Sequence, residues 1–271
     1  MAAEPWQIGV DEVGKGSVLG DMVHGAVAAA GDLPLPGRLL RLVVDSKKST
    51  PANRAALYDW MLGSLRVVQR SDGCLSGVLM SEGAPVLAVA LAVTSAAAIN
   101  AGGNLNDVCA RATWRAVQAA LRLLPESARA GARVRLDRLG SSQDAHLGLL
   151  RAAGMDAALL ARCTSEIRAD DRWPAVQLAS CLAKEHRDRR LADQAGPGLN
   201  GYPADRPTLA LLRQLLASPD DPRNAIVRTK WETVQRLRRE LEQPEPAPAN
   251  PDTPDTPARP VRKRTAEEAF C

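Results

Sequence analysis

Residues 8–20 read IGVDEVGKGSVLG and combine a short strand pattern with two adjacent acids and a flexible turn. Ile8 and Val10 are apolar residues spaced by two, a pattern typical of a half-buried β-strand. Asp11 and Glu12 follow where the side chains of that strand leave the sheet. A carboxylate in such a place is costly to bury unless it is paired or coordinates a metal ion. The acids therefore favour a metal site at the end of the first strand.

A glycine-flanked turn, Gly14-Lys15-Gly16, comes directly after the two acids. Glycine carries no Cβ, so another backbone can approach such a turn closely. Together with the acids, the turn favours a metal site over which a polymer backbone lies.

Three other interpretations of this stretch stay open from its residues alone. The spacing of Gly9, Gly14 and Lys15 matches a phosphate-binding loop, but Gly16 stands where that motif has Ser or Thr. The two acids would also lie inside the loop that has to hold phosphates. A dinucleotide-binding fingerprint fails because Gly14, Gly16 and Gly20 miss its spacing by one residue. The third interpretation is an ordinary strand-to-turn junction with solvated acids.

The composition indicates a chain with a substantial core and no disulfide framework. A length of 271 residues allows one large domain or two small ones, and 45% hydrophobic residues can form a real core. Only 3% of residues are aromatic, so the core must consist mainly of Ala, Leu and Val. The net charge of +4 permits nucleic-acid binding through a local patch without requiring it. The cysteines are odd in number and lack a C-x-x-C pair, which favours a reducing compartment over disulfides or a zinc site. They are Cys74, Cys109, Cys163, Cys181 and Cys271.

The sequence contains no pattern that predicts a membrane or secretory segment. The N-terminus lacks a basic region followed by an apolar one, so we expect no secretory signal. Residues 86–99 are apolar but too short to cross a bilayer, and we expect them to be buried core. We therefore expect a soluble, cytoplasmic, monomeric protein without membrane contact.

Alternating apolar residues predict several short strands, the first two joined as a hairpin. The strand that contains Ile8 and Val10 is expected to pair with residues 22–30. The further strands are expected at residues 40–44, 65–69, 76–80, 133–136 and, as an edge strand, 155–160.

Helical periodicity and capping residues predict the helices. Thr50 followed by Pro51 is a favoured helix start. Asp170, Asp171 and Pro174 mark the start of a longer helix. The expected helices cover residues 51–61, 105–124, 143–153, 170–195, 208–216 and 231–241. Strands followed by helices, with a hairpin at the start, predict an α/β or α+β domain around a mixed sheet.

The composition changes abruptly after Glu242. Seven prolines fall between Pro244 and Pro260 with few apolar residues among them, which predicts a disordered Pro-rich tail over residues 243–271. A basic run at residues 261–264 could give this tail a weak contact with nucleic acid or a partner. We expect one folded unit over residues 1–242, of which about 206–242 form a helical C-terminal part.

Four acids stand at the ends of predicted elements and could converge on one edge of the sheet. Asp11 and Glu12 end one strand, Asp137 ends another, and Asp170 stands at a helix N-terminus, where the helix dipole favours its charge. Mg²⁺ prefers carboxylate oxygens and shares phosphate oxygens of a substrate. Two such ions about 4 Å apart activate a water and stabilise the leaving oxygen of a phosphodiester. Spacing alone leaves the convergence of the four acids open.

Five motifs occur in the order and approximate spacing of the type 2 ribonucleases H: VDEVGKG, DSKKS, RLDRLG, ADDRWPAVQLASCLAKEHRDR and GYPAD. From about residue 8 to residue 241 the sequence most resembles ribonuclease HII. The resemblance implies an RNase H-like sheet flanked by helices, with a helical C-terminal part. It also implies Mg²⁺- or Mn²⁺-dependent cutting of the RNA strand of RNA–DNA hybrids, and cutting 5′ to ribonucleotides embedded in duplex DNA. The products would carry 3′-hydroxyl and 5′-phosphate ends.

The same resemblance implies roles for particular residues. Asp170 is preferred to Asp171 as the fourth acid because it stands four residues before Pro174. The glycine motif would contact the 2′-hydroxyl through its backbone, and the tyrosine of GYPAD would stack on the sugar after the ribonucleotide. The catalytic, metal-binding residues would be Asp11, Glu12, Asp137 and Asp170. The nucleic-acid-binding residues would be Gly14, Lys15, Gly16, Ser46, Lys47, Lys48, Lys184 and Tyr202.

Simpler structural roles remain open for several of these side chains and their neighbours. The two lysines of DSKKS could be solvated loop residues, and Tyr202 could be a packed turn residue. Arg187 and Asp188 are interpreted as a structural ion pair on the long helix, and His186 as a surface residue.

The sequence departs from the family pattern in places. Lys15 replaces the usual arginine, so bidentate phosphate binding is lost there. Gln177-Leu178 replaces small residues, and residues 83–93 have no clear counterpart. VGKGS also resembles ribonuclease HIII, whose fourth acid is usually Glu and which usually has an added N-terminal domain that the residues before Ile8 cannot form. The alternatives are a ribonuclease HIII-like variant, a catalytically weak hybrid-binding module, or a related nuclease acting on another DNA structure.

Overall fold

The described part of the chain forms a mixed sheet covered by helices. The computed structural model describes residues 5–43, 49–71 and 73–242. Within these ranges the sheet has seven strands in the order β3-β4-β5-β2-β1-β6-β7. β1 pairs antiparallel with β2 and parallel with β6, which confirms the predicted hairpin at the start. The strands are β1 (Trp6–Val13), β2 (Met22–Ala30), β3 (Val67–Ser71), β4 (Cys74–Ser81), β5 (Ala84–Thr94), β6 (Arg133–Asp137) and β7 (Cys163–Glu166).

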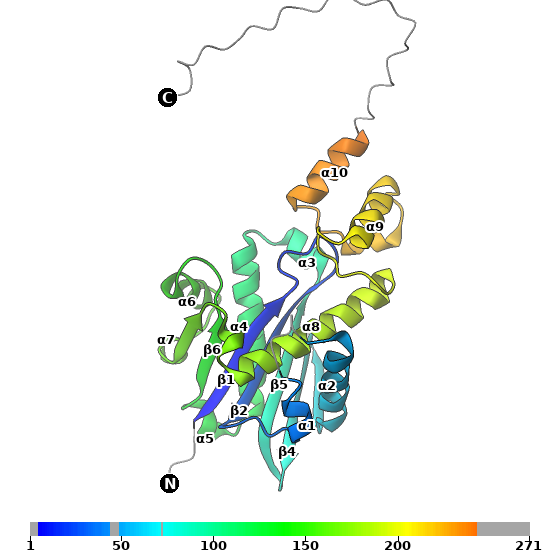
Figure 1. The fold of residues 1–271 in the computed structure, drawn as a ribbon. Coiled ribbons are helices and arrows are strands. Elements are labelled where there is room, and N and C mark those ends of the chain that lie inside the picture. Colours follow the sequence, from blue (N-terminus) through cyan, green and yellow to red (C-terminus); the bar gives the residue numbers. More distant parts are fainter. Residues whose placement is uncertain (1–4, 44–48, 72, 243–271) are drawn as a thin grey trace, which may run out of the picture.

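Helices cover both faces of the sheet, with α8 crossing one face and α4 lying on the other (Figure 1). Thr50 caps α2 as predicted, because its hydroxyl accepts a hydrogen bond from Asn53 N at 3.2 Å. The predicted mixed sheet flanked by helices is confirmed. The helices are α1 (Gly37–Leu40), α2 (Pro51–Ser64), α3 (Ala96–Ala101), α4 (Leu105–Leu123), α5 (Glu126–Arg129), α6 (Gln143–Ala152), α7 (Ala157–Leu160), α8 (Pro174–Ala195), α9 (Arg206–Ala217) and α10 (Glu232–Glu242), with 3₁₀ turns η1 (Ala169–Asp171) and η2 (Pro222–Ile226).

The two central strands are buried on both faces, which explains why residues 22–30 form an uninterrupted apolar run. Successive side chains of a strand point to opposite faces. Ile8 and Val10 therefore pack towards α4 and α6, whereas Val13 and Val27 pack towards α2 and α8. The two hydrophobic cores, one on each face of the sheet, are rich in Ala, Leu and Val, as the composition requires.

Two predicted strands are wrong. The first was expected at residues 40–44, of which the structure describes 40–43: α1 ends at Leu40 and a turn follows. Leu39 and Val43 are both buried, and their spacing of four is helical rather than extended. Residues 155–160 contain α7, because the side chain of Asp156 caps a helical turn. The edge strand follows as β7. Residues 86–99 belong to β5 and α3, and no described helix is both long and apolar enough to cross a membrane.

The long helix expected from Asp170 begins four residues later, at Pro174. Proline disfavours the helical conformation of the residue before it, and Trp173 is extended with ψ 110°. Asp170 consequently lies in the separate turn η1 and not on α8.

Helix α8 lies so close to the sheet that two positions beneath it admit no side chain. A Cβ on Gly9 would lie 2.2 Å from the backbone of Ala175, and a Cβ on Gly25 would lie 2.5 Å from Ala179 O. Real Cβ atoms do not approach other atoms this closely, so glycine is required at both strand positions. The two glycines thereby fix the height of α8 above β1 and β2.

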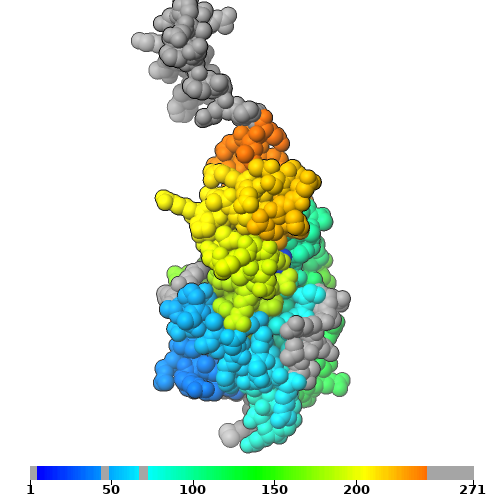
Figure 2. All heavy atoms as spheres, turned by 90° about the vertical axis from the view of Figure 1, so that its right-hand side faces the viewer, coloured from blue at the N-terminus to red at the C-terminus, as the bar shows by residue number. Residues whose placement is uncertain are grey.

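The C-terminal helices pack on the loop that follows β1. Val18 and Leu19 of this loop share a buried cluster with Leu212 of α9 and Val234 of α10. Leu19 also forms an isolated β-bridge with Val227. Figure 1 shows α9 and α10 beyond the ends of the strands, and Figure 2 shows them continuing the surface of α8. The proposed tail, residues 243–271, lies outside the described residues.

We expect Gly9→Ala to destabilise the fold by about 3 kcal/mol, because the added methyl group forces α8 off the sheet. Gly148→Ala is the matched control, since Gly148 is exposed in α6 and a Cβ there meets no atom within 4 Å. The control should gain about 0.5–1 kcal/mol from helix propensity. Urea unfolding followed by circular dichroism measures both. Equal stability of Gly9→Ala and the parent would show that α8 is not held at this distance.

Candidate metal centre and nucleic-acid interface

Three carboxylates from two neighbouring strands meet at one point. Val10 pairs with Leu136 in the parallel register of β1 and β6, so the next residues along the two strands, Asp11 and Asp137, lie side by side. One oxygen each of Asp11, Glu12 and Asp137 lies within 4.8 Å of the others. Oxygen ligands at this spacing are what a hard divalent cation such as Mg²⁺ requires. The donor set therefore fits a divalent metal ion.

Asp170 lies beside this group, although it is not one of the three residues that meet within 4.8 Å. Its side chain is buried, and its negative charge contributes to the raised pKa of Asp11. The turn that carries it is tied to the strand end, because Ala169 N donates a hydrogen bond to Asp137 Oδ1 at 3.0 Å. The preceding residue, Arg168, has a left-handed backbone with φ 56°. Non-glycine residues in this region cost about 1 kcal/mol or more and are concentrated at functional sites.

Burial and mutual repulsion raise the pKa values of Asp11 and Glu12. Burial raises the pKa of Asp11 to about 7; a hydrogen bond with Ser180 opposes the shift, and the charges of Asp137 and Asp170 add to it. Burial raises the pKa of Glu12 well above its ordinary value, and the negative charge of Asp11 is the second-largest cause. A bound divalent cation reverses this situation, because it requires ionised ligands and displaces their protons.

The glycine turn after β1 is held against the tyrosine of the GYPAD motif. Gly14 N donates a hydrogen bond to the hydroxyl of Tyr202 at 3.2 Å. The turn that carries Tyr202 is shaped by Asp205, which caps α9 by accepting a hydrogen bond from Thr208 N at 3.1 Å. A Cβ on Gly16 would have Tyr202 as its nearest neighbour, at 4.0 Å, so the surface between turn and ring is open.

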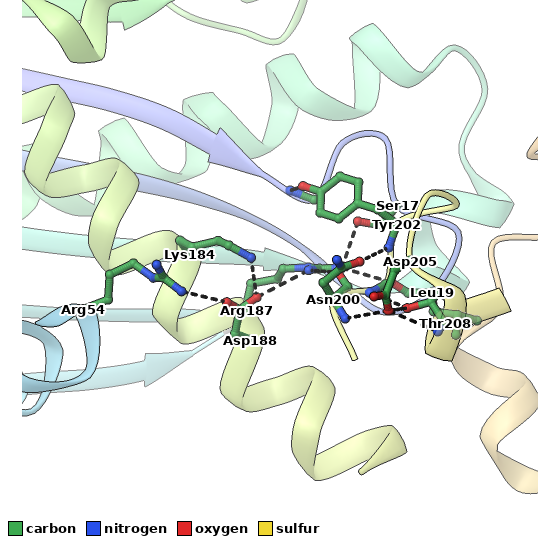
Figure 3. Close-up of polar contacts among 12 residues, drawn as sticks. Ser17, Leu19, Arg54, Lys184, Arg187, Asp188, Asn200, Tyr202, Asp205 and Thr208 are labelled. Carbon is green, nitrogen blue, oxygen red and sulfur yellow. Dashed lines mark hydrogen bonds and ion pairs between the residues drawn. The ribbon is translucent and has the colours of Figure 1, made fainter. Parts of the chain in front are cut away.

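Arg187 of α8 connects these two segments from below (Figure 3). Its side chain is fully buried and donates to Asn200 O at 2.5 Å and to Ser17 Oγ at 2.8 Å. Its contact with Asp188 is 3.5 Å long. The expected ion pair exists. The shorter bonds of Arg187, however, join the glycine loop, which is residues 14–20, to the turn that carries the GYPAD motif.

The predicted basic contacts have different surroundings. Lys184 Nζ lies 2.8 Å from Asp188 Oδ1, and both are drawn in Figure 3. Lys15 is half-buried, and its positive charge opposes the raised pKa of Glu12. His186, interpreted as a surface residue, is half-buried with Nδ1 2.7 Å from the hydroxyl of Tyr58. The remaining three, Ser46, Lys47 and Lys48, lie outside the described residues.

Four residues at the site were not predicted as site residues from the sequence, and one of them, Arg187, was interpreted only as an ion-pair partner. Ser180 bonds Asp11, and Arg187 and Arg228 bond the glycine loop. His24 pairs with Glu12 across β1 and β2 and is fully buried, and neither ring nitrogen bonds to a described residue. Burial, followed by the charge of Arg115, lowers the pKa of His24 to about 3, so its ring is neutral. The family-like helix motif contains Ser180 and Arg187, whereas no signal marks Arg228 or His24.

Comparisons with known proteins show the family and the fold. Residues 8–234 match the family model described as Ribonuclease HII. The chain is 30% identical over 234 residues to a Ribonuclease HII of Aeropyrum pernix, covering 85% of this chain and 89% of that one. Its fold is similar to the crystal structure of the ribonuclease H2 from Pyrococcus horikoshii OT3, with a TM-score of 0.63, 24% identity, and coverage of 88% of this chain and 99% of that one. It is also similar to Bst-RNase HIII in complex with Mn²⁺, with a TM-score of 0.62, 16% identity, and coverage of 87% and 70%.

We expect Asp137→Asn to stabilise the metal-free protein at pH 8 by about 1 kcal/mol, because it removes a charge that repels Asp11 and Glu12. The folded pKa of Asp11, about 7, lies above its ordinary value of 3.8. The stabilisation from this carboxyl is therefore fully present below about pH 4 and is lost as the pH rises towards 7. The advantage of the variant should shrink at pH 5. Thermal unfolding in EDTA at both pH values measures this.

The matched control is Asp220→Asn, which removes an exposed acid away from the site and should leave the unfolding curves unchanged. Mn²⁺ should raise the melting temperature of the parent and of this control, but raise that of Asp137→Asn much less. Identical pH profiles for the parent and Asp137→Asn would contradict the convergence of the acids.

Proposed function

Because the chain belongs to the ribonuclease HII family, we propose that it cuts the RNA strand of RNA–DNA hybrids, and also cuts 5′ to single ribonucleotides embedded in duplex DNA. The chain is a type 2 ribonuclease H, a phosphodiester-hydrolysing endonuclease. The products carry 3′-hydroxyl and 5′-phosphate ends. The observation that carries the proposal is the group of three carboxylates within 4.8 Å, next to a glycine turn that faces a tyrosine ring.

In this proposal Asp11, Glu12, Asp137 and Asp170 hold Mg²⁺ or Mn²⁺. When bound, such ions supply a nucleophilic water and stabilise the charge on the leaving oxygen. The protein contributes a fixed set of oxygens on two strand ends and one turn. Ser180 orients Asp11 through its hydrogen bond, in the way that partners of metal ligands usually do.

The nucleic-acid strand is proposed to lie over the turn Gly14-Lys15-Gly16, with a sugar against the ring of Tyr202. The space beside Gly16 supports this placement, since a Cβ built there would meet only Tyr202, at 4.0 Å, and a sugar in that space would collide with a side chain at position 16. Lys184 and the DSKKS residues Ser46, Lys47 and Lys48 are proposed to lie near the phosphates. Residues 1–242 form the proposed catalytic unit, with 206–242 as its helical C-terminal part.

We expect purified protein with Mg²⁺ or Mn²⁺ to cut a DNA duplex that contains one ribonucleotide and to leave the all-DNA duplex intact. Asp137→Asn should abolish cutting, because a metal ligand is lost, while duplex binding persists. Gel analysis of end-labelled duplexes measures cutting, and fluorescence anisotropy measures binding. An intact ribonucleotide duplex would refute the proposed activity, and equal cutting of both duplexes would indicate a nuclease for another DNA structure. Detectable turnover by the parent excludes a hybrid-binding module without catalysis.

We expect Gly16→Ala to leave stability unchanged and to lower cutting efficiency by about tenfold or more. The methyl group has room in the free protein, since its nearest neighbour is Tyr202 at 4.0 Å, but it occupies the space proposed for the sugar. Gly103→Ala serves as the control, because Gly103 is an exposed loop glycine whose Cβ would meet no atom within 4 Å. Full activity of Gly16→Ala would place the strand elsewhere.

A further inference from the structure

Arg228 joins the C-terminal part of the described chain to both ends of the glycine loop, residues 14–20. It lies between η2 and α10, its side chain is fully buried, and 214 residues separate it from Gly14. Its Nη1 donates to Gly14 O at 2.5 Å and to Lys15 O at 3.2 Å. Its Nε donates to Gly20 O at 2.9 Å. One side chain thus holds three carbonyl groups of the loop.

These bonds determine where the N–H groups of the turn point. A trans peptide is planar, so its C=O and N–H point in opposite directions. The Gly14 carbonyl shares a peptide with Lys15 N–H, and the Lys15 carbonyl shares one with Gly16 N–H. Because Arg228 draws both carbonyls inwards, both N–H groups point outwards. Neither of these two nitrogens donates to a described residue, whereas Ser17 N is used within the turn, at 3.3 Å from Gly14 O.

The charge behind the turn strengthens these two donors. No carboxylate in the described ranges lies within ion-pair distance of Arg228, and the buried Arg187 lies on the same side of the loop. Burial, followed by the charge of Arg187, lowers the pKa of Arg228 to about 10, so the guanidinium is still charged at neutral pH. A buried cation on the carbonyl side polarises both peptides, and hydrogen bonds in such chains reinforce one another.

We propose that Arg228 is a positioning residue that holds Lys15 N–H and Gly16 N–H outwards as a donor pair for the 2′-oxygen of a ribonucleotide. The pair lies beside the Gly16–Tyr202 opening and next to the acids. Arg228 thereby sets the preference for ribonucleotide-bearing duplex over all-DNA duplex. This inference rests on the proposed function, and it adds a determinant of its substrate preference from outside the catalytic group.

The test compares the dissociation constants of an all-DNA duplex and the same duplex with one ribonucleotide, by fluorescence anisotropy in EDTA, where no cutting occurs. The ratio is the dissociation constant of the all-DNA duplex divided by that of the ribonucleotide duplex. It is measured for the parent, for Arg228→Lys and for the control Arg223→Lys. Arg223 is a suitable control because its guanidinium bonds Asp221 and not the loop. We expect the ratio to fall by about fivefold or more in Arg228→Lys only, since lysine cannot hold three carbonyls at once. Partial unfolding lowers both affinities equally, so it cannot produce the expected fall in the ratio.

Several outcomes overturn the inference. An unchanged ratio in Arg228→Lys would do so, as would a ratio near one in the parent. Equal weakening of both duplexes leaves the ratio unchanged, so it overturns the inference as well. If the parent cuts the ribonucleotide duplex and the ratio does not change, the proposed function stands and the role of Arg228 falls. Failure to cut refutes the proposed function, whatever the ratio.

A second measurement uses the parent protein and does not depend on the folding of a variant. In ¹⁵N-resolved amide exchange, Lys15 and Gly16 should exchange quickly in the free protein. They should become protected on binding the ribonucleotide duplex, but not the all-DNA duplex. Equal protection by both duplexes would contradict the inference.

Discussion

The close packing of α8 on β1 and β2 is the constraint on which the site depends. Gly9 and Gly25 permit this approach, and any side chain at either position would overlap the backbone of the helix. Ser180 and Arg187 are seven residues apart on α8, which is about two turns, so both face the sheet. One helix therefore supports Asp11 through Ser180 and the glycine loop through Arg187. The proposed metal centre and the proposed strand-binding surface are therefore supported by the same helix.

The site separates charge in a way that suits a nucleic-acid strand. The acids repel one another, whereas the loop beside them is backed by the buried guanidinium groups of Arg187 and Arg228. Neither arginine faces the solvent, so their effect reaches the surface through oriented peptide groups. Preorganised dipoles of this kind require no rearrangement when a ligand arrives. The lysine that replaces the family arginine at position 15 keeps its backbone, and the backbone is the part that Arg228 orients.

Much of the fold followed from local signals, and the errors have a common physical cause. The β1–β2 hairpin and the Thr50 cap were predicted because alternation and capping are local properties. Residues 40–44 and 155–160 were predicted as strands on apolar content, whereas burial at helical spacing and the Asp156 cap make the first a turn and the second a helix. For the site, the positions of the acids at element ends were predictable, and their roles stay predictions. The role of Arg228 could not be predicted from the sequence, because its bonding partners are more than 200 residues away in the chain. An arginine without a motif around it is expected to be a solvated surface residue.

The bridge between Arg228 and the glycine loop has a consequence for synthesis on the ribosome. Chains fold largely in the order in which they emerge, and β1 with its two acids emerges before the C-terminal helices. The loop after β1, however, takes its shape from Gly201, Ile226 and Arg228, and Arg228 emerges 214 residues after Gly14. A nascent chain can thus assemble its sheet and its acids while the neighbouring loop still lacks the contacts that hold it. The surface proposed to grip a nucleic-acid strand is completed only when synthesis of the folded unit is almost finished.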